Sequence, residues 1–233
     1  MKYTYLFVDA GTIFVPLLFS FHRRIDFASR WKAFFPAAAL VATLFLIWDD
    51  GFTRAGVWGF NPHYVVGLYI GRLPVEEFLF FICIPYACVF TYHAWDLFYS
   101  KPPHRRTAAM ITLILGIVLL TAGAVNWHRR YTAATFLSLG ALLIICRYFW
   151  RIAWLHRFYI VWLFLLLPLV VVDGILTGTG LQQPVVWYDP ADILGVRILT
   201  IPIEDLFYGM ELILLNLLVL SWIMPDHKIK QPG

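Results

Sequence analysis

Seven long apolar runs constrain the fold of this chain more than any other feature of its sequence. They cover residues 3–21, 33–48, 73–95, 108–126, 132–149, 158–176 and 198–224. Each run is close to the length, about 20 residues, at which an α-helix crosses the apolar core of a bilayer. Charged residues make up 14% of the chain, compared with about 25% in soluble domains. The sequence therefore predicts an all-α integral membrane protein, a seven-helix bundle with little mass outside the membrane.

The positions of Lys and Arg predict the orientation of the chain, because cytoplasmic loops are enriched in these residues. If the N-terminus lies outside, twelve of the eighteen fall on the inner side: Arg23, Arg24, Arg30, Lys32, Lys101, Arg105, Arg106, Arg147, Arg151, Arg157, Lys228 and Lys230. We therefore expect a multi-pass protein of the cell inner membrane with its N-terminus outside and its C-terminus inside. The first run lacks a small-residue cleavage pattern, so we expect a retained helix. The basic residues lie between apolar runs, which indicates contact with membrane lipid and no nucleic-acid partner.

An internal repeat organises the sequence. At an offset of 128 residues, three segments align: Leu73-Pro74-Val75-Glu76-Glu77-Phe78 with Ile201-Pro202-Ile203-Glu204-Asp205-Leu206, Asn61-Pro62 with Asp189-Pro190, and Gly67 with Gly195. Each copy contains three helices, so a linking helix is needed if both copies are to have the same orientation in the membrane. We therefore predict a 3+1+3 arrangement, with the first copy at residues 1–100, the linking helix at 101–130 and the second copy at 131–233.

Two acidic pairs in the repeat are the candidate catalytic residues. A proline precedes each pair: Pro74 comes before Glu76 and Glu77, and Pro202 comes before Glu204 and Asp205. Acidic residues favour the N-terminal turn of any helix, so one pair alone would indicate only a helix start. Recurrence of the pair favours a function, because an ionisable residue within a span costs about 2.5–3.5 kcal/mol. Four carboxyl groups in a poorly solvated cavity cannot all be ionised, so we expect some to hold protons and act as general acids.

Several further residues are expected to support these acids. Tyr208 and Glu211 share a helix face with Glu204, where the tyrosine either orients the acid and relays protons or simply packs. Asp50 and Asp173 align at an offset of 123 residues and, with Asp49, end the second and sixth helices on the same outer side. There they either cap the helices or join the site.

The remaining motifs argue against a metal or a cofactor. The three cysteines lie in apolar runs, at spacings that indicate neither a zinc site nor a disulfide framework. The histidines follow no ligand spacing, and the Glu-x-x-His signature of carboxylate-bridged metal sites is absent from the sequence. No glycine-rich strand-to-helix fingerprint is present either, so a dinucleotide or flavin site finds no support.

The repeated Pro-x-Glu-Glu/Asp motif, followed by Phe/Leu-x-Phe/Tyr, resembles that of the small membrane lycopene cyclases. These enzymes are known as heterodimers in some bacteria and as fused chains elsewhere, and this chain looks like the fused form. The resemblance covers nearly all of the chain. By position, the family's acidic motif falls on the following residues: Pro74, Glu76 and Glu77, then Pro202, Glu204 and Asp205, the last being the allowed Asp variant.

The resemblance implies an isomerase of carotenoid biosynthesis that needs no cofactor. Protonation of carbon 2 of a linear ψ-end group leaves a tertiary cation at carbon 1. Attack by the 5,6 double bond closes the ring, and loss of a proton from carbon 6 gives the β-ionone end, so one carboxyl group donates a proton and another accepts one. Aromatic faces could stabilise the cation; the candidates are Trp58, Phe80, Trp187 and Tyr208. The family also includes cyclases of prenyl-extended carotenoids, and contact with other carotenoid-pathway enzymes is conceivable.

Three other functions fit the pattern less well. A proton-coupled transporter would also place acids in parallel repeats, but it would be expected to have broken helices and acids spread across the membrane. A retinal-binding rhodopsin needs a Schiff-base lysine in its seventh helix, and no Lys occurs between Lys101 and Lys228. A purely structural subunit would leave the duplicated acids unexplained.

Overall fold

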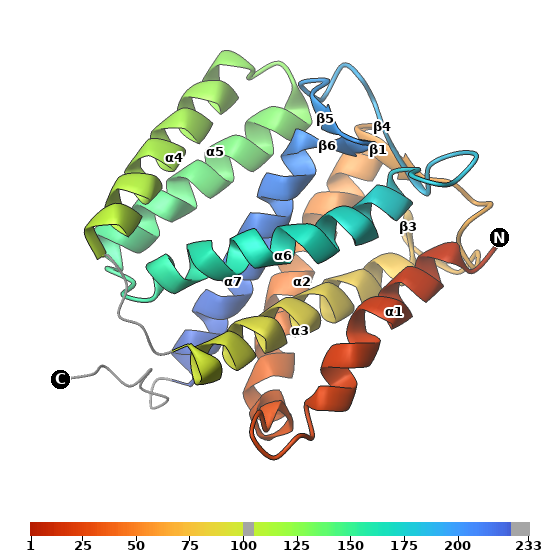
Figure 1. Cartoon of the computed structure of the whole chain (residues 1–233). Coiled ribbons are helices and arrows are strands. Elements are labelled where there is room, and N and C mark those ends of the chain that lie inside the picture. The colour runs from red at the N-terminus through yellow and green to blue at the C-terminus, as the bar shows by residue number, and fades with distance from the viewer. Residues whose placement is uncertain (100–104, 225–233) are drawn as a thin grey trace. The chain divides into compact units, whose positions relative to one another are not determined.

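The computed structural model describes residues 1–99 and 105–224, and seven α-helices make up most of this part of the chain (Figure 1). The helices are α1 (Thr4–Phe19), α2 (Trp31–Arg54), α3 (Val75–Phe98), α4 (Arg105–Val125), α5 (Arg130–Ile144), α6 (Leu155–Leu176) and α7 (Ile203–Ile223). A 3-10 turn, η1 (Phe27–Arg30), precedes α2, and a π-helical turn, η2 (Ile145–Phe149), continues α5. Six helices are long and apolar enough to cross a membrane, whereas α1 has 16 residues and is shorter. The predicted helical membrane fold is confirmed. Lys101, Lys228 and Lys230, which count toward the predicted inner side, lie outside the described residues.

The helix α2 extends further than the apolar run at residues 33–48. It continues to Arg54, which places Asp49 and Asp50 inside the helix and not at its end. An ion pair one turn apart supports this extension, because Arg54 Nη2 lies 2.7 Å from Asp50 Oδ2. The expectation that the second helix ends at its two aspartates was therefore wrong.

Short strands, which the sequence analysis did not predict, precede the two acidic helices. The hairpin β2 (Tyr69–Ile70) with β3 (Leu73–Pro74) leads into α3, and β5 (Arg197–Ile198) with β6 (Ile201–Pro202) leads into α7. Their registers match, since Pro74 pairs with Tyr69 and Pro202 pairs with Arg197. Each proline stands just before its helix, where a residue without an N–H group is tolerated. A third small sheet joins β1 (Trp58–Phe60) to β4 (Val186–Tyr188).

The chain forms two compact units. The first contains α1, α2, α3 and the part of α7 from Leu212 onward. Within it α3 contacts both α1 and α2, and a cluster of aromatic rings centred on Phe27 packs edge-on with Phe90 and Tyr86. Edge-to-face contacts of this kind stabilise an apolar core beyond simple burial.

The second unit contains α4, α5, α6 and the part of α7 up to Glu211. Here α4 and α5 lie side by side (Figure 1). Glycines allow the close approach, since a Cβ atom on Gly116 would come within 2.8 Å of Ile144 and one on Gly140 within 2.9 Å of Leu120. Small residues at such contacts are typical of helices packed within a membrane.

Candidate active site

The first acidic pair lies in the first turn of α3 and is buried. Glu76 and Glu77 have 0% and 6% of their surface exposed. Glu76 Oε1 accepts a hydrogen bond from the Val66 N–H group at 2.6 Å, and Glu77 Oε2 accepts one from the Tyr5 hydroxyl at 2.6 Å. The other oxygen of Glu76, Oε2, is buried without a hydrogen-bond partner. One acid is thus anchored to the loop before the helix, and the other to α1.

The second acidic pair has the same arrangement at the start of α7. Glu204 Oε1 accepts the Leu194 N–H group at 2.7 Å and the Thr132 hydroxyl at 2.5 Å, while its Oε2 is buried without a partner. Asp205 accepts hydroxyl groups at both oxygens, from Tyr131 at 2.5 Å and from Tyr188 at 2.8 Å. Both acids are buried, so the pair is shielded from water.

One contact of each acid in the first pair has a counterpart in the second pair. The Val66–Glu76 and Leu194–Glu204 bonds are related by the sequence offset of 128 residues, and each joins the first acid to a loop amide ten residues earlier. The tyrosine partners are related by an offset of 126, because Tyr5 in α1 corresponds to Tyr131 in α5. The repeat therefore extends from the sequence motif to the hydrogen bonds that orient its carboxyl groups.

Two further acids, Asp9 and Asp49, join the first pair, and we name the set Tyr5, Asp9, Asp49, Glu76 and Glu77 the first cluster. Asp9 is 1% exposed, neither of its oxygens has a hydrogen-bond partner, and its charged neighbours are Glu77 and Glu76. Asp49 is 2% exposed and shares a hydrogen bond with Glu77, which requires one of the two carboxyl groups to hold a proton.

The sequence analysis missed Asp9 and left the role of Asp49 open. The signal for Asp9 was available, because it is an acidic residue in the middle of an apolar run, which is a functional hypothesis by default. The other predicted helix-end acids lie elsewhere: Asp50 pairs with Arg54 with 27% of its side chain exposed, and Asp173 is half-buried in the last turn of α6.

We name Tyr131, Thr132, Tyr188, Glu204 and Asp205 the second cluster, and aromatic rings surround it. The ring of Trp58 stands edge-on to Tyr131 at 5.0 Å and to Tyr208 at 6.3 Å between centroids. Tyr208 was predicted either to serve Glu204 or to pack, and its ring lies in this aromatic group. The hydroxyl groups that bind Asp205 come from Tyr131 and Tyr188, which the sequence analysis did not single out.

The other predicted supporting residues lie near the clusters or at the surface. Glu211 is buried further along α7 and accepts a hydrogen bond from the Ser138 hydroxyl at 2.7 Å. Phe80 packs edge-on against Tyr5 at 6.3 Å. Trp187 is 44% exposed, and its ring covers Gly59, where a Cβ atom would come within 2.4 Å of it. Phe80 therefore contacts a member of the first cluster, Glu211 lies two turns along α7 from Glu204, and Trp187 mainly covers the loop.

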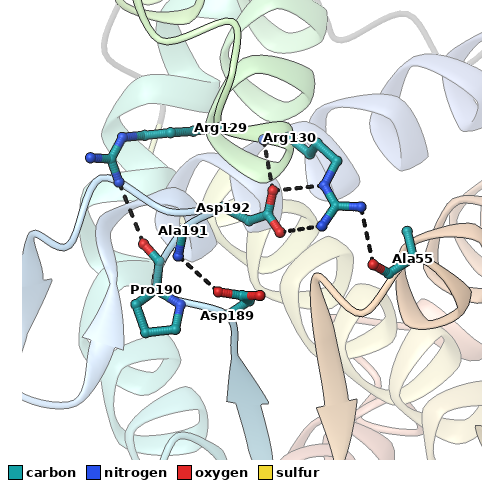
Figure 2. Close-up of polar contacts among 7 residues, drawn as sticks. All are labelled: Ala55, Arg129, Arg130, Asp189, Pro190, Ala191 and Asp192. Carbon is teal, nitrogen blue, oxygen red and sulfur yellow. Dashed lines mark hydrogen bonds and ion pairs between the residues drawn. The ribbon is translucent and has the colours of Figure 1, made fainter.

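An ion pair holds the loop that supplies the Leu194 amide (Figure 2). The Asp192 carboxylate accepts hydrogen bonds from Arg130 Nε at 2.8 Å and from its Nη2 at 2.6 Å, and Arg130 also donates to the Ala55 carbonyl at 3.0 Å. Arg129 binds the same loop through the Pro190 carbonyl at 3.5 Å. The hydrogen bonds from Arg130 hold the pKa of Asp192 below its ordinary value, so the pair stays charged at neutral pH.

The two clusters offer acid–base chemistry in an apolar setting. Each contains carboxyl groups oriented by hydroxyl or amide donors, a glutamate Oε2 atom that is buried and unpartnered, and aromatic neighbours. Among the described residues, no group of three or more His, Cys, Asp and Glu side chains is arranged to hold a metal ion. Such clusters suit proton transfer to and from an apolar molecule with a passing positive charge.

Comparison with known proteins identifies a family. A family model described as lycopene cyclase matches residues 2–95 and 128–223, which together make up most of the chain and contain both acidic pairs. No curated protein and no solved structure matches the chain.

Proposed function

This chain belongs to the lycopene cyclase family, and on that premise we propose that it closes the ψ-end groups of lycopene into β-ionone rings through its two carboxyl clusters. Family membership makes it a membrane enzyme of carotenoid biosynthesis with a linear carotenoid substrate. The observation that carries the proposal is the buried, unpartnered Oε2 atom of one glutamate in each copy, Glu76 and Glu204.

Glu76 and Glu204 are the proton donors in this proposal. In each of them Oε1 is anchored by a loop N–H group, which fixes the direction of the carboxyl group. Their Oε2 atoms have no partner within the protein, so a proton held there is available to carbon 2 of the substrate. No water competes for this proton in a buried site, which matters because the polyene is a weak base.

Glu77 and Asp205 are the proton acceptors. Tyrosine hydroxyl groups donate to them, so the bound oxygens act as hydrogen-bond acceptors and are held in place. After the 5,6 double bond attacks the cation at carbon 1, such a carboxylate removes the proton from carbon 6. One proton enters and one leaves for each ring, so the reaction has no net change in redox state or composition. The aromatic rings of Trp58 and Tyr208 stabilise the cation while it exists.

Asp9 returns the proton within the first cluster. At the end of each cyclisation the donor lacks a proton and the acceptor carries an extra one. Asp9 has Glu76 and Glu77 as its charged neighbours, and both of its oxygens are unpartnered. A carboxyl group in this place can take the proton from Glu77 with one oxygen and deliver one to Glu76 with the other, without bulk water.

We also propose the finer organisation of the chain. The first copy occupies residues 1–100, the linking helix 101–130 and the second copy 131–233 of the sequence. The N-terminus lies outside and the C-terminus inside the cell inner membrane, which is supported by the excess of Lys and Arg on one side. Both acidic pairs then lie toward the outer face.

The test is expression of the chain in a bacterial host that accumulates lycopene, with chromatography of the extracted pigments. Wild type is expected to give cyclic carotenoids. Glu76→Gln and Glu204→Gln keep an oxygen for the loop N–H group but cannot donate a carboxyl proton, so each is expected to lower cyclisation by about 10²-fold or more. Asp50→Asn, which changes a half-buried acid of α2 that pairs with Arg54, is the control.

Two results would contradict the proposal. Cyclic products from both glutamine variants at wild-type levels would remove these glutamates from the chemistry. Persistent lycopene with well-expressed wild type, followed by cyclisation of a prenyl-extended carotenoid supplied instead, would show that the substrate is the longer polyene.

A further inference from the structure

A second polar feature lies in the unit that contains α4, α5 and α6, at the opposite end of α5 from the second cluster. It is a cavity of about 120 Å³ between the beginnings of α4 and α6 and the chain that follows η2. The residues that line it include Thr112 from α4, Arg147 from η2, Arg151, Leu155 and His156. Two guanidinium groups and an imidazole thus meet at one small cavity.

The cations of this cavity have no acidic residue near them in the sequence. No Asp or Glu occurs between Asp96 and Asp173, whereas the same stretch carries eight Lys and Arg residues: Lys101, Arg105, Arg106, Arg129, Arg130, Arg147, Arg151 and Arg157. In the part of the chain that the structure describes, the salt bridges involve neither Arg147 nor Arg151. Cations gathered at a cavity without protein carboxylates attract an anion from elsewhere.

The backbone at the cavity is strained in a way that favours a function. The chain leaves the π-helical turn through hydrogen bonds from the Trp150 N–H to the Ile145 carbonyl at 3.0 Å and from the Ile152 N–H to the Cys146 carbonyl at 2.8 Å. Between them Arg151 has φ +52°, a left-handed conformation that glycine adopts at far lower cost. Strained residues of this kind and π-helical turns both concentrate at functional sites.

Helix ends add to the positive potential of the cavity. Leu155 is the first residue of α6, and Ala108, which also lines the cavity, lies in the first turn of α4. The first N–H groups of a helix lack intrahelical partners and carry the positive end of the helix dipole. The cavity therefore combines two helix N-termini with two arginines, which is the chemistry that binds phosphate.

We infer that this cavity binds the phosphate of an anionic phospholipid headgroup. A phosphate group is small enough for the cavity, and both arginines can direct several N–H groups to its oxygens. A lipid is favoured over a soluble phosphate because the three residues between the two arginines are large, aromatic and exposed: Tyr148, Phe149 and Trp150, at 47%, 76% and 45%. These side chains can contact the acyl chains of the same lipid. The inference stands independently of the cyclisation chemistry.

The test compares ligands on the purified full chain in a neutral detergent. Dihexanoyl phosphatidylglycerol, dihexanoyl phosphatidylcholine and inorganic phosphate are titrated separately, and the midpoint of thermal unfolding is followed. We expect phosphatidylglycerol to raise the midpoint at concentrations where the other two have no effect. The apparent affinity for phosphatidylglycerol is expected to fall by about fivefold for each arginine lost, and so by about thirtyfold in Arg147→Gln/Arg151→Gln.

Two variants keep the test independent of damage to the fold. Arg23→Gln/Arg24→Gln removes the same charge from an exposed turn outside the cavity and is expected to respond as wild type does. Arg151→Gly relieves the left-handed backbone, so it is expected to be at least as stable as wild type in phosphatidylcholine yet to bind phosphatidylglycerol about fivefold more weakly. Equal responses of wild type and the Arg147/Arg151 variant would overturn the inference, and so would an equal response of wild type to inorganic phosphate.

Discussion

Asp9 offers the sharpest test, because its roles in stability and in catalysis predict opposite effects. The substitution is Asp9→Thr, which introduces the residue found at the corresponding position of the second copy, Thr135. Asp9 is 1% exposed and neither of its carboxyl oxygens has a partner. Thr135 Oγ1 is also buried without a partner, so the substitution leaves one unpartnered oxygen where Asp9 has two.

The size of the stability effect follows from this difference. Leaving a buried polar group without a hydrogen bond costs about 1–3 kcal/mol in proteins. Replacing two such oxygens with one is therefore expected to raise the free energy of unfolding by about 1–3 kcal/mol. Turnover is expected to fall by about 10²–10⁴-fold, which is the usual cost in rate of losing a positioned proton carrier.

The assay measures both quantities on one preparation. Denaturant unfolding of the purified chain gives the stability, and the initial rate of ring formation per mole of folded protein gives the turnover. Thr135→Ser is the control at the matching position of the second copy. We expect it to change neither the free energy of unfolding nor the turnover by much. Higher stability with unchanged turnover would refute the proton-return role of Asp9, and lower stability would refute the reasoning from its unpartnered oxygens.

Three more substitutions test the contacts around the second cluster. Tyr131→Phe removes a hydroxyl donor from a buried acid and is expected to lower the free energy of unfolding by about 1.5–3 kcal/mol; an unchanged denaturation midpoint would contradict this. Asp192→Asn is expected to cost about 1 kcal/mol at pH 7, because Arg130 is half-exposed. Since the pKa of Asp192 is lowered in the fold, wild type keeps this contribution above the ordinary value of 3.8 and loses it as the pH falls through the lowered pKa. The unfolding curves of the two proteins should therefore converge as the pH is lowered below 3.8. Leu199→Gly relieves a left-handed φ of +56° at a hairpin tip and is expected to add about 1 kcal/mol of stability, measured in the same way; a loss of stability would mean that the leucine side chain is needed there.

The helices and the acidic motif could be predicted from the sequence because both have strong local causes. Runs of apolar residues near bilayer length specify membrane helices whatever their neighbours are. Pro74 and Pro202 mark helix starts because proline has no N–H group to donate, and the structure places each of them directly before its helix. The repeat at an offset of 128 residues then identified the acids that the structure shows in matching surroundings.

The partners of those acids were harder to predict because they depend on contacts between distant segments. Tyr5 and Tyr131 lie more than 70 residues from the acids they bind. They also align at an offset of 126 residues, so a search for repeated residues at an offset of 128 does not find them. The hairpins contain two residues per strand, too few for an alternating pattern. Beyond Asp49, α2 continues through polar residues that include an ion pair one turn apart, and the apolar runs do not reveal this extension.

The short first helix has a consequence for how the protein enters the membrane. At 16 residues α1 is about 24 Å long, which is less than the apolar thickness of a bilayer of about 30 Å. It also carries Asp9, and an aspartate near the middle of a span costs about 2.5–3.5 kcal/mol during insertion. Alone, α1 is therefore a poor substrate for the insertion machinery. Its stable placement depends on α3, which supplies the Glu77 carboxyl group to Tyr5, so α1 is expected to settle in the membrane only after α3 has arrived.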